Sequence, residues 1–332
     1  MSKSVTTITP HRISFAGGGT DIPKFYKNYG GAVLSTTIDK YLYVTVKYHS
    51  PLFKENFRLC YSETERTNSL EEINNSIARE CLRLVPIDHP VYISTVSDIP
   101  ASTGLGSSSS FAVGLLHALH LLRGEKVSAG QLAEESSNVE INVLNYPIGK
   151  QDQYAAAYGG LNYFKFQQNG AVKIEHILPP NNSIKLLFNS ILLFWTGVQR
   201  KSEDVLIEQH KSINEKQDSL IYIKDLVKDC RAILQKEPLD LKAFGEVLHN
   251  GWSKKRNLAS NISNSKIDSY YSIALENGAY GGKIAGAGGG GFLMIVCDPQ
   301  KKDFIKNKLR QLVALDIDYE PRGSQKLYSL DC

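Results

Sequence analysis

Cysteine is scarce in this sequence, and none of the five residues stands at a metal-binding or redox spacing. Scattered cysteines of this kind are typical of reduced thiols, so we expect a cytoplasmic protein without a disulfide framework. The first residues lack the apolar core of a signal peptide. The longest apolar run, Phe111–Leu122, is too short to cross a bilayer. The sequence therefore predicts no membrane partner.

An excess of charge of one sign is also absent. The 38 basic and 34 acidic residues leave a net charge of +4, and the basic residues are spread along the chain. This balance suits small anionic ligands and does not indicate nucleic acid, which requires a clustered basic surface. The length of 332 residues favours two domains. We place the domains at 1–180 and 181–332, because Pro and Asn cluster at this boundary. A strand is expected at Ile184–Trp195.

The Walker pattern of phosphate-binding loops is missing, but another glycine-rich loop is present. Pro100–Ser110 reads Pro-Ala-Ser-Thr-Gly-Leu-Gly-Ser-Ser-Ser-Ser. It lies between a predicted strand at Val91–Val96 and an apolar run long enough for about three helical turns. A helix that begins at these serines offers unpaired N–H groups to a phosphate and hydroxyls to Mg²⁺. The alternative is a serine-rich cap on a buried helix.

Two further glycine runs lie nearer the two ends of the chain. Gly17-Gly18-Gly19 precedes Thr20 and Asp21, and allows the main chain to pass close to a ligand; a flexible turn is the alternative. Gly286–Gly291 leads into a predicted strand at Phe292–Cys297. A dinucleotide fingerprint would follow a strand and open a helix, so a Rossmann dehydrogenase is not indicated.

Two carboxylates stand out between these runs. Glu140 is surrounded by apolar residues on a helix predicted over Ser128–Val143, which is unusual for a solvated face. Asp152 opens a short helix of small residues, where simple capping is the alternative.

Three stretches together resemble the three motifs of the GHMP kinases, the family named for galactokinase, homoserine kinase, mevalonate kinase and phosphomevalonate kinase. Pro10–Asp21 resembles the first motif, Pro100–Ser110 the phosphate loop, and Lys283–Gly291 the third. The order and spacing cover nearly the whole chain. The resemblance implies a two-domain α/β (α+β) fold, with an N-terminal half like ribosomal protein S5 domain 2 and a ferredoxin-like C-terminal half.

The resemblance also implies roles for individual residues. Asp152 matches the catalytic aspartate, and Arg12 matches the basic residue near it. Glu140 matches the glutamate that holds Mg²⁺ together with Ser107 or Ser108. The ATP phosphates would lie on the loop residues Gly104, Leu105, Gly106, Ser107, Ser108 and Ser109.

The first motif bears on the acceptor. Gly18 and Gly19 replace the Glu-His of galactokinases, which opens space for a longer and possibly anionic arm. This form most resembles the D-glycero-D-manno-heptose 7-phosphate kinases, which phosphorylate the C1 hydroxyl in nucleotide-activated heptose synthesis. An L-fucokinase or another sugar-1-kinase is the first alternative, and a non-catalytic sensor of the same fold is the second. The expected partners are therefore a small sugar phosphate and ATP.

A sugar phosphate needs basic partners in a partly buried site. The candidates are Arg200 with Lys201, and the group Lys254, Lys255 and Arg256, with arginine preferred for its bidentate fork. The full set expected to bind the acceptor is Gly18, Gly19, Thr20, Asp21, Gly288, Gly289, Arg200 and Arg256.

Overall fold

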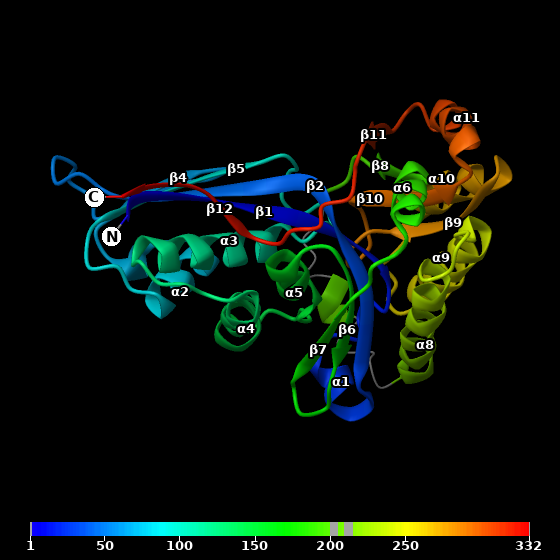
Figure 1. Cartoon of the computed structure of the whole chain (residues 1–332), viewed down its shortest axis with the longest axis horizontal. Coiled ribbons are helices and arrows are strands. Elements are labelled where there is room, and N and C mark those ends of the chain that lie inside the picture. Colours follow the sequence, from blue (N-terminus) through cyan, green and yellow to red (C-terminus); the bar gives the residue numbers. More distant parts are fainter. Residues whose placement is uncertain (1, 200–204, 209–214, 332) are drawn as a thin grey trace.

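The computed structural model describes residues 2–199, 205–208 and 215–331 and contains two β-sheets with helices packed on them (Figure 1). The larger sheet and its helices form an elongated arm, and the smaller sheet lies at the other end of the molecule. This arrangement confirms the predicted α/β fold with two structural units.

The larger sheet is built on two long antiparallel strands, β1 (Ser2–Ala16) and β2 (Gly31–Tyr48). Its order is β12-β1-β2-β5-β3-β4, and β6 and β7 branch from the first half of β2. The other strands are β3 (Phe57–Cys60), β4 (Thr64–Thr67), β5 (Val91–Ser97), β6 (Leu161–Phe166), β7 (Val172–His176) and β12 (Gln325–Asp331). The end of the chain thus returns to the first sheet.

Four helices cover one face of this sheet (Figure 1): α2 (Ser76–Leu84), α3 (Ser107–Leu122), α4 (Ala129–Ser137) and α5 (Gln151–Tyr158). Helix α3 is apolar on most sides because it lies between β1 and the other helices. A Cβ added at Gly114 would lie 2.8 Å from Thr9 Oγ1, so this helix approaches β1 closely. That packing fixes the position of its N-terminus.

The smaller sheet has the antiparallel order β11-β8-β10-β9. Helices fill the connections from β8 to β9 and from β10 to β11, which is the ferredoxin-like pattern expected for this half. The strands are β8 (Ile191–Trp195), β9 (Ala279–Ile284), β10 (Phe292–Cys297) and β11 (Val313–Leu315). The remaining helices are α1 (Pro23–Tyr29), α6 (Asn181–Asn189), α8 (Gln217–Leu234), α9 (Leu241–Lys255), α10 (Ser265–Glu276) and α11 (Lys302–Lys308), with 3₁₀ turns at Leu70–Glu72 and Pro299–Lys301.

A buried apolar cluster joins the two sheets. Ile13 and Phe15, near the end of β1, pack with Phe244 and Leu248 of α9, and the rings of Phe15 and Phe244 meet edge-to-face at 5.2 Å. The predicted boundary after residue 180 falls between β7 and α6, but β12 crosses back to β1. A single cut therefore does not separate the two sheets, and the boundary itself stays a prediction.

One sequence prediction about secondary structure was wrong. The strand expected at Ile184–Trp195 is a helix, α6, followed by a shorter strand, β8. Pro180 precedes the first turn, and Leu187 and Phe188 in the last turn are buried. A continuous apolar run does not distinguish a buried strand from a helix by periodicity alone.

The chain after α4 widens into a π-helix at Asn138–Val143. The Leu144 N–H donates to the Val139 carbonyl at 3.0 Å, five residues back. Glu140 lies on this turn with no exposed surface. Single π turns inside helices are concentrated at functional sites, and this one directs a carboxylate inward.

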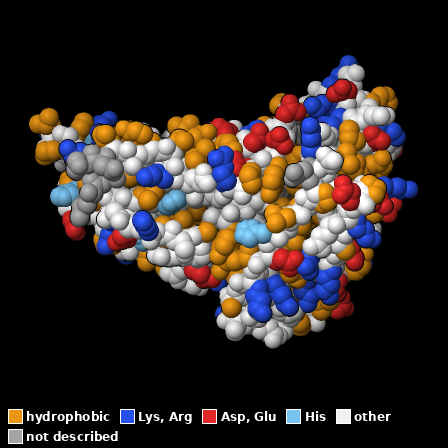
Figure 2. All heavy atoms as spheres, in the orientation of Figure 1, with side chains coloured by type: hydrophobic (Ala, Val, Ile, Leu, Met, Phe, Trp, Pro, Cys, Tyr) orange, Lys and Arg blue, Asp and Glu red, His pale blue; other side chains and the backbone are white. Residues whose placement is uncertain are grey.

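The surface carries acidic and basic side chains together over much of the face in Figure 2. In the described part of the chain, none of the helices combines the length and the apolar character needed to span a bilayer.

Candidate active site

A cavity of about 870 Å³ lies where β1, α3, α5 and α9 come together. A polar group of lining residues comes from β1, the first glycine run, α5 and α9: Arg12, Gly19, Asp21, Gln151, Asp152 and Lys255. A second group comes from the strands, helices and adjoining turns further along the arm: Tyr61, Asn75, Ile77, Thr95, Phe111 and Tyr146. The loop between β5 and α3 lines the same cavity.

That loop has the backbone that the sequence predicted. Gly104 and Gly106 have φ angles of +83° and +82°, which side chains rarely adopt, and Gly106 is the residue before the first turn of α3. Ser107 and Ser108 line the cavity at the start of the helix. The first N–H groups of a helix have no partner within it, and the dipole there is positive, so this end is suited to an anion.

Glu140 meets the same end of α3 from the π-helix. Its Oε2 accepts hydrogen bonds from Ser109 Oγ at 2.8 Å and Gln153 Nε2 at 2.6 Å, and Ser108 also donates to it. Complete burial raises the pKa of Glu140 to about 7, against the opposing effect of these hydrogen bonds. Glu140 Oε1 and Ser107 Oγ are buried without a hydrogen-bond partner. Two unpaired oxygens of this kind fit a cation or a polar ligand.

Arg12 and Asp152 form a paired unit beside the loop. Arg12 Nε donates to Asp152 Oδ1 at 2.7 Å, its Nη2 donates to Oδ2, and its Nη1 donates to the Gly104 carbonyl at 2.7 Å. The Arg12 side chain is 5% exposed and that of Asp152 is 24% exposed. The guanidinium thus fixes the carboxylate in one orientation, while the carboxylate keeps contact with the cavity.

Asp21 connects the first glycine run to the start of α5. Its carboxylate accepts hydrogen bonds from the N–H of Gly19 at 3.0 Å, the N–H of Gln151 at 3.2 Å and Gln151 Nε2 at 3.1 Å. Burial raises the pKa of Asp21, and the charge of Asp152 raises it further. Thr20 has no exposed surface, and its hydroxyl donates to backbone carbonyls. Thr20 therefore shapes the loop, and the expected contact between this residue and the acceptor has no open surface.

The third glycine run lies against the phosphate loop. A Cβ on Gly104 would lie 2.4 Å from the Ala285 carbonyl oxygen, so the two loops meet backbone to backbone. Gly286 and Ala287 line the cavity. Gly288 and Gly289, which we expected to bind the acceptor, instead face Ile262: a Cβ on Gly288 would collide with it, and the Gly289 N–H donates to its carbonyl at 2.7 Å. These two glycines are therefore not among the residues that line the cavity.

The basic group at the end of α9 divides between two surfaces. Lys255 is 6% exposed and lines the cavity, and its Nζ donates to the Gly286 carbonyl at 2.6 Å. Arg256, the residue preferred from the sequence, lines a separate hollow and lies 3.7 Å from Asp268. The other candidate, Arg200, lies outside the residues that the structure describes. Of the α9 group, the structure therefore brings Lys255 and not Arg256 to this cavity.

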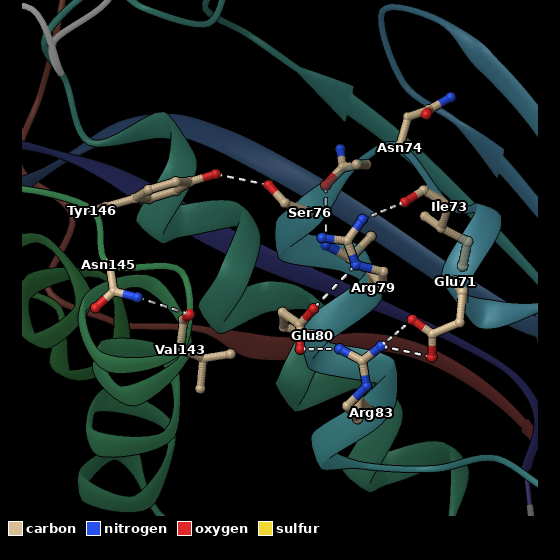
Figure 3. Close-up of polar contacts among 12 residues, drawn as sticks. Glu71, Ile73, Asn74, Ser76, Arg79, Glu80, Arg83, Val143, Asn145 and Tyr146 are labelled. Carbon is tan, nitrogen blue, oxygen red and sulfur yellow. Dashed lines mark hydrogen bonds and ion pairs between the residues drawn. The ribbon is translucent and has the colours of Figure 1, made fainter.

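The far wall of the cavity includes residues that the sequence analysis did not identify. Figure 3 shows the Tyr146 hydroxyl at Ser76 Oγ, a contact of 2.7 Å between the segment after the π-helix and the start of α2. Nearby on α2, Arg83 bridges Glu80 and Glu71 on the outside of this wall. Tyr146 and Ile77 give the cavity an aromatic and apolar end. No local motif indicated these residues, because they meet only through the packing of separate elements.

These parts are complementary in chemistry. A helix N-terminus can bind phosphate, buried serine and glutamate oxygens can bind a divalent cation, and a fixed carboxylate can accept a proton. The described residues include no cluster of three or more His, Cys, Asp or Glu side chains suited to a metal. A cation at Glu140 would therefore depend on oxygens of a ligand or water, as Mg²⁺ commonly does.

Comparisons with known families agree with the resemblance seen in the motifs. Residues 71–160 match the family model for the GHMP kinases N-terminal domain, and residues 226–315 match that for the GHMP kinases C-terminal domain. A D-glycero-alpha-D-manno-heptose 7-phosphate kinase of Campylobacter jejuni is 32% identical over 93% of this chain and 94% of its own length. A galactokinase of Pyrococcus furiosus is 25% identical over 95% of both chains.

Solved structures give the same result. A D-glycero-D-manno-heptose 1-phosphate kinase from Bacteroides thetaiotaomicron superposes with a TM-score of 0.80 at 25% identity, over 98% of this chain and 99% of that one. A putative sugar kinase from Campylobacter jejuni superposes with a TM-score of 0.76 at 25% identity, over 99% of both chains. The similarity in fold therefore extends over both sheets.

Proposed function

Since the chain belongs to the GHMP kinase family and is a sugar kinase, we propose that it transfers the γ-phosphoryl group of ATP to the anomeric C1 hydroxyl of D-glycero-D-manno-heptose 7-phosphate. The product is the 1,7-bisphosphate, an intermediate for nucleotide-activated heptose. The observation that carries this proposal is the placement of two carboxylates at the start of α3: Asp152 lines the cavity there, and Glu140 is buried against the first turn of the helix. The curated relative with the same named substrate supports the choice of sugar.

The residues around the phosphate loop divide into two tasks. The N-terminal N–H groups of α3 bind and orient the phosphates of ATP. The unpaired oxygens of Glu140 and Ser107, with Ser108 beside them, fit Mg²⁺, which when bound neutralises charge on the phosphates. The metal role predicted for Ser107 and Ser108 is retained in this proposal, and Ser109 positions Glu140 through its hydrogen bond.

Asp152 and Arg12 act on the acceptor. The C1 oxygen forms a bond to the γ-phosphorus, the bond from that phosphorus to the bridging oxygen of ADP breaks, and the hydroxyl proton passes to Asp152. Arg12 holds the carboxylate through two of its N–H groups, so that one geometry is presented to the hydroxyl. Asp21 lines the same cavity, and in this proposal it accepts a hydrogen bond from a ring hydroxyl.

A coupled assay of ADP release tests the proposal. The purified protein is supplied with ATP, Mg²⁺ and one acceptor at a time: heptose 7-phosphate, L-fucose, galactose or mannose. We expect the highest kcat/KM with heptose 7-phosphate, and a phosphorus–H1 coupling in the NMR spectrum of the product. A preference for fucose would favour the fucokinase alternative, and absence of turnover with any sugar would favour a ligand-binding sensor.

A further inference from the structure

The cavity contains a lysine that the roles above do not use. Lys255 continues the buried side of α9 after Phe244, Leu248 and Trp252. Its Nζ donates to the Gly286 carbonyl, the one hydrogen-bond acceptor recorded for it within the described ranges. An ammonium group has three donors, so two remain for another partner.

The first glycine run leaves this ammonium accessible. A Cβ added at Gly18 would lie 3.6 Å from Lys255 Nζ and 3.9 Å from Gln151 Nε2. The φ angle of Gly18 is one that other residues adopt, so the backbone does not require glycine at this position. A longer side chain would fill the space in front of the lysine. The absence of a side chain at this position therefore preserves space beside a buried cation.

Within the described residues, Lys255 forms no ion pair with a neighbouring carboxylate. Arg12 is paired with Asp152, and the carboxylate of Asp21 accepts hydrogen bonds from Gly19 and Gln151. Lys283 of β9 donates from its Nζ to backbone carbonyls of β1. Arg12 disfavours a positive charge on Lys255, while Asp21 and Asp152 favour it.

We propose that Lys255 binds an anionic group on the exocyclic arm of the acceptor, a phosphate monoester, and so selects sugar phosphates over unphosphorylated sugars. This inference rests on the proposed kinase function and names the residue that recognises the phosphate of its substrate. A phosphate that accepts two hydrogen bonds from Lys255 would satisfy the free donors and supply the missing negative charge. Arg256 does not line this cavity and is not part of the subsite.

The ionisation of Lys255 is consistent with such a partner. Burial lowers the pKa of Lys255 to about 8, with Arg12 acting in the same direction. A bound dianion would favour the ammonium form. We therefore expect the protein to take up a proton from the buffer when it binds the sugar phosphate near pH 8. Titration calorimetry in buffers of different ionisation enthalpy measures this proton uptake.

The test compares Lys255→Met with Lys254→Met, a change in the adjacent exposed lysine, which lies over the ring of Tyr222. Both variants and the wild type are assayed with heptose 7-phosphate and with the unphosphorylated heptose. For Lys255→Met we expect the KM for heptose 7-phosphate to rise about 10- to 100-fold, because hydrogen bonds to a charged group are lost. The KM values for ATP and for the unphosphorylated heptose should change less than about threefold. Lys254→Met should match the wild type.

A second variant, Gly18→Val, places atoms in front of Lys255 without removing the charge. It should also raise the KM for heptose 7-phosphate more than that for heptose. An equal fall in kcat for both sugars in Lys255→Met, with KM unchanged, would assign the lysine to the transferred phosphoryl group and overturn the inference. Unchanged kinetics with both sugars would overturn it as well. In either case the wild type would still use heptose 7-phosphate, so the proposed function would stand. If the wild type were active only on unphosphorylated sugars, both the role of Lys255 and the proposed function would be refuted.

Discussion

Replacement of Asp152 by Asn tests the catalytic pair most directly. The amide keeps one oxygen for Arg12 but turns an NH₂ group toward the other guanidinium donor, so one of the two hydrogen bonds is lost. The amide also cannot accept the hydroxyl proton. We expect kcat to fall by about 10²–10⁴-fold, which is the usual contribution of a general base. ATP should still bind, because Arg12 keeps its hydrogen bond to the Gly104 carbonyl of the phosphate loop.

The same change has a cost in stability that the structure allows us to estimate. The Arg12 side chain is 5% exposed and that of Asp152 is 24% exposed, so solvent screens the pair only in part. Loss of one charge-assisted hydrogen bond should lower the free energy of unfolding by about 1.5–3 kcal/mol. At about 2–4 °C for each kcal/mol, the melting temperature should fall by several degrees. Differential scanning fluorimetry and initial-rate kinetics on the same preparation measure both effects.

Glu80→Gln is a matched control for this loss of stability. Glu80 is a buried carboxylate that accepts hydrogen bonds from Arg79 and Arg83 on α2, and it does not line the cavity (Figure 3). The same replacement of oxygen by NH₂ should lower the melting temperature while kcat stays near the wild-type value. If Asp152→Asn kept kcat within about fivefold of the wild type, Asp152 would not be the proton acceptor. An equal loss of activity in both variants would attribute the effect to folding.

Three further predictions concern the cation, the loop contact and pH. Glu140→Gln should raise the Mg²⁺ concentration needed for half-maximal rate by at least tenfold, because a buried carboxylate oxygen without a partner is replaced; an unchanged Mg²⁺ titration would exclude it as a ligand. Gly104→Ala should raise the KM for ATP and lower the melting temperature, since its Cβ would lie 2.4 Å from the Ala285 carbonyl oxygen, whereas Gly124→Ala, at φ +79° with open space, should affect stability alone. The KM for heptose 7-phosphate should be constant from pH 7 to 7.5 and rise above about pH 8, because Lys255, with its lowered pKa, loses its positive charge above that pH. The Lys255→Met variant should lack this rise.

The parts of the site that are local in sequence could be predicted from it. A strand, a bent glycine loop and a helix that begins in serines occur in order within Val91–Leu122, and each has its own residue signal. Which serine faces Glu140 is a different question. Consecutive residues on a helix point about 100° apart, so the choice depends on how α3 is rotated against the π-helix. The structure gives the direct hydrogen bonds to Ser109 and Ser108, and leaves Ser107 without a partner.

The sequence could have predicted that Lys255 is buried and that Arg256 is not. At about 100° per residue, Phe244 and Trp252 span about 80° of the circumference of α9, and Lys255 falls inside that arc. Arg256 falls about 40° beyond it, toward solvent. The preference for arginine as a phosphate ligand considered side-chain chemistry without this geometry. An apolar stripe that ends in a lysine predicts a buried cation, and a buried cation predicts a partner.

The glycines of the second and third runs explain why the motifs are informative only together. A Cβ on Gly286 would lie 2.7 Å from Gly104 Cα, and one on Gly291 would lie 2.3 Å from the Thr103 carbonyl oxygen. Each loop therefore excludes side chains from the other, and a substitution in either would separate the smaller sheet from the phosphate loop. The sequence distance between them conceals this dependence, because a glycine run read alone suggests flexibility or a ligand. Several glycines at this site allow the phosphate loop and the third glycine run to touch. That contact brings Lys255 and Asp152 to the same cavity.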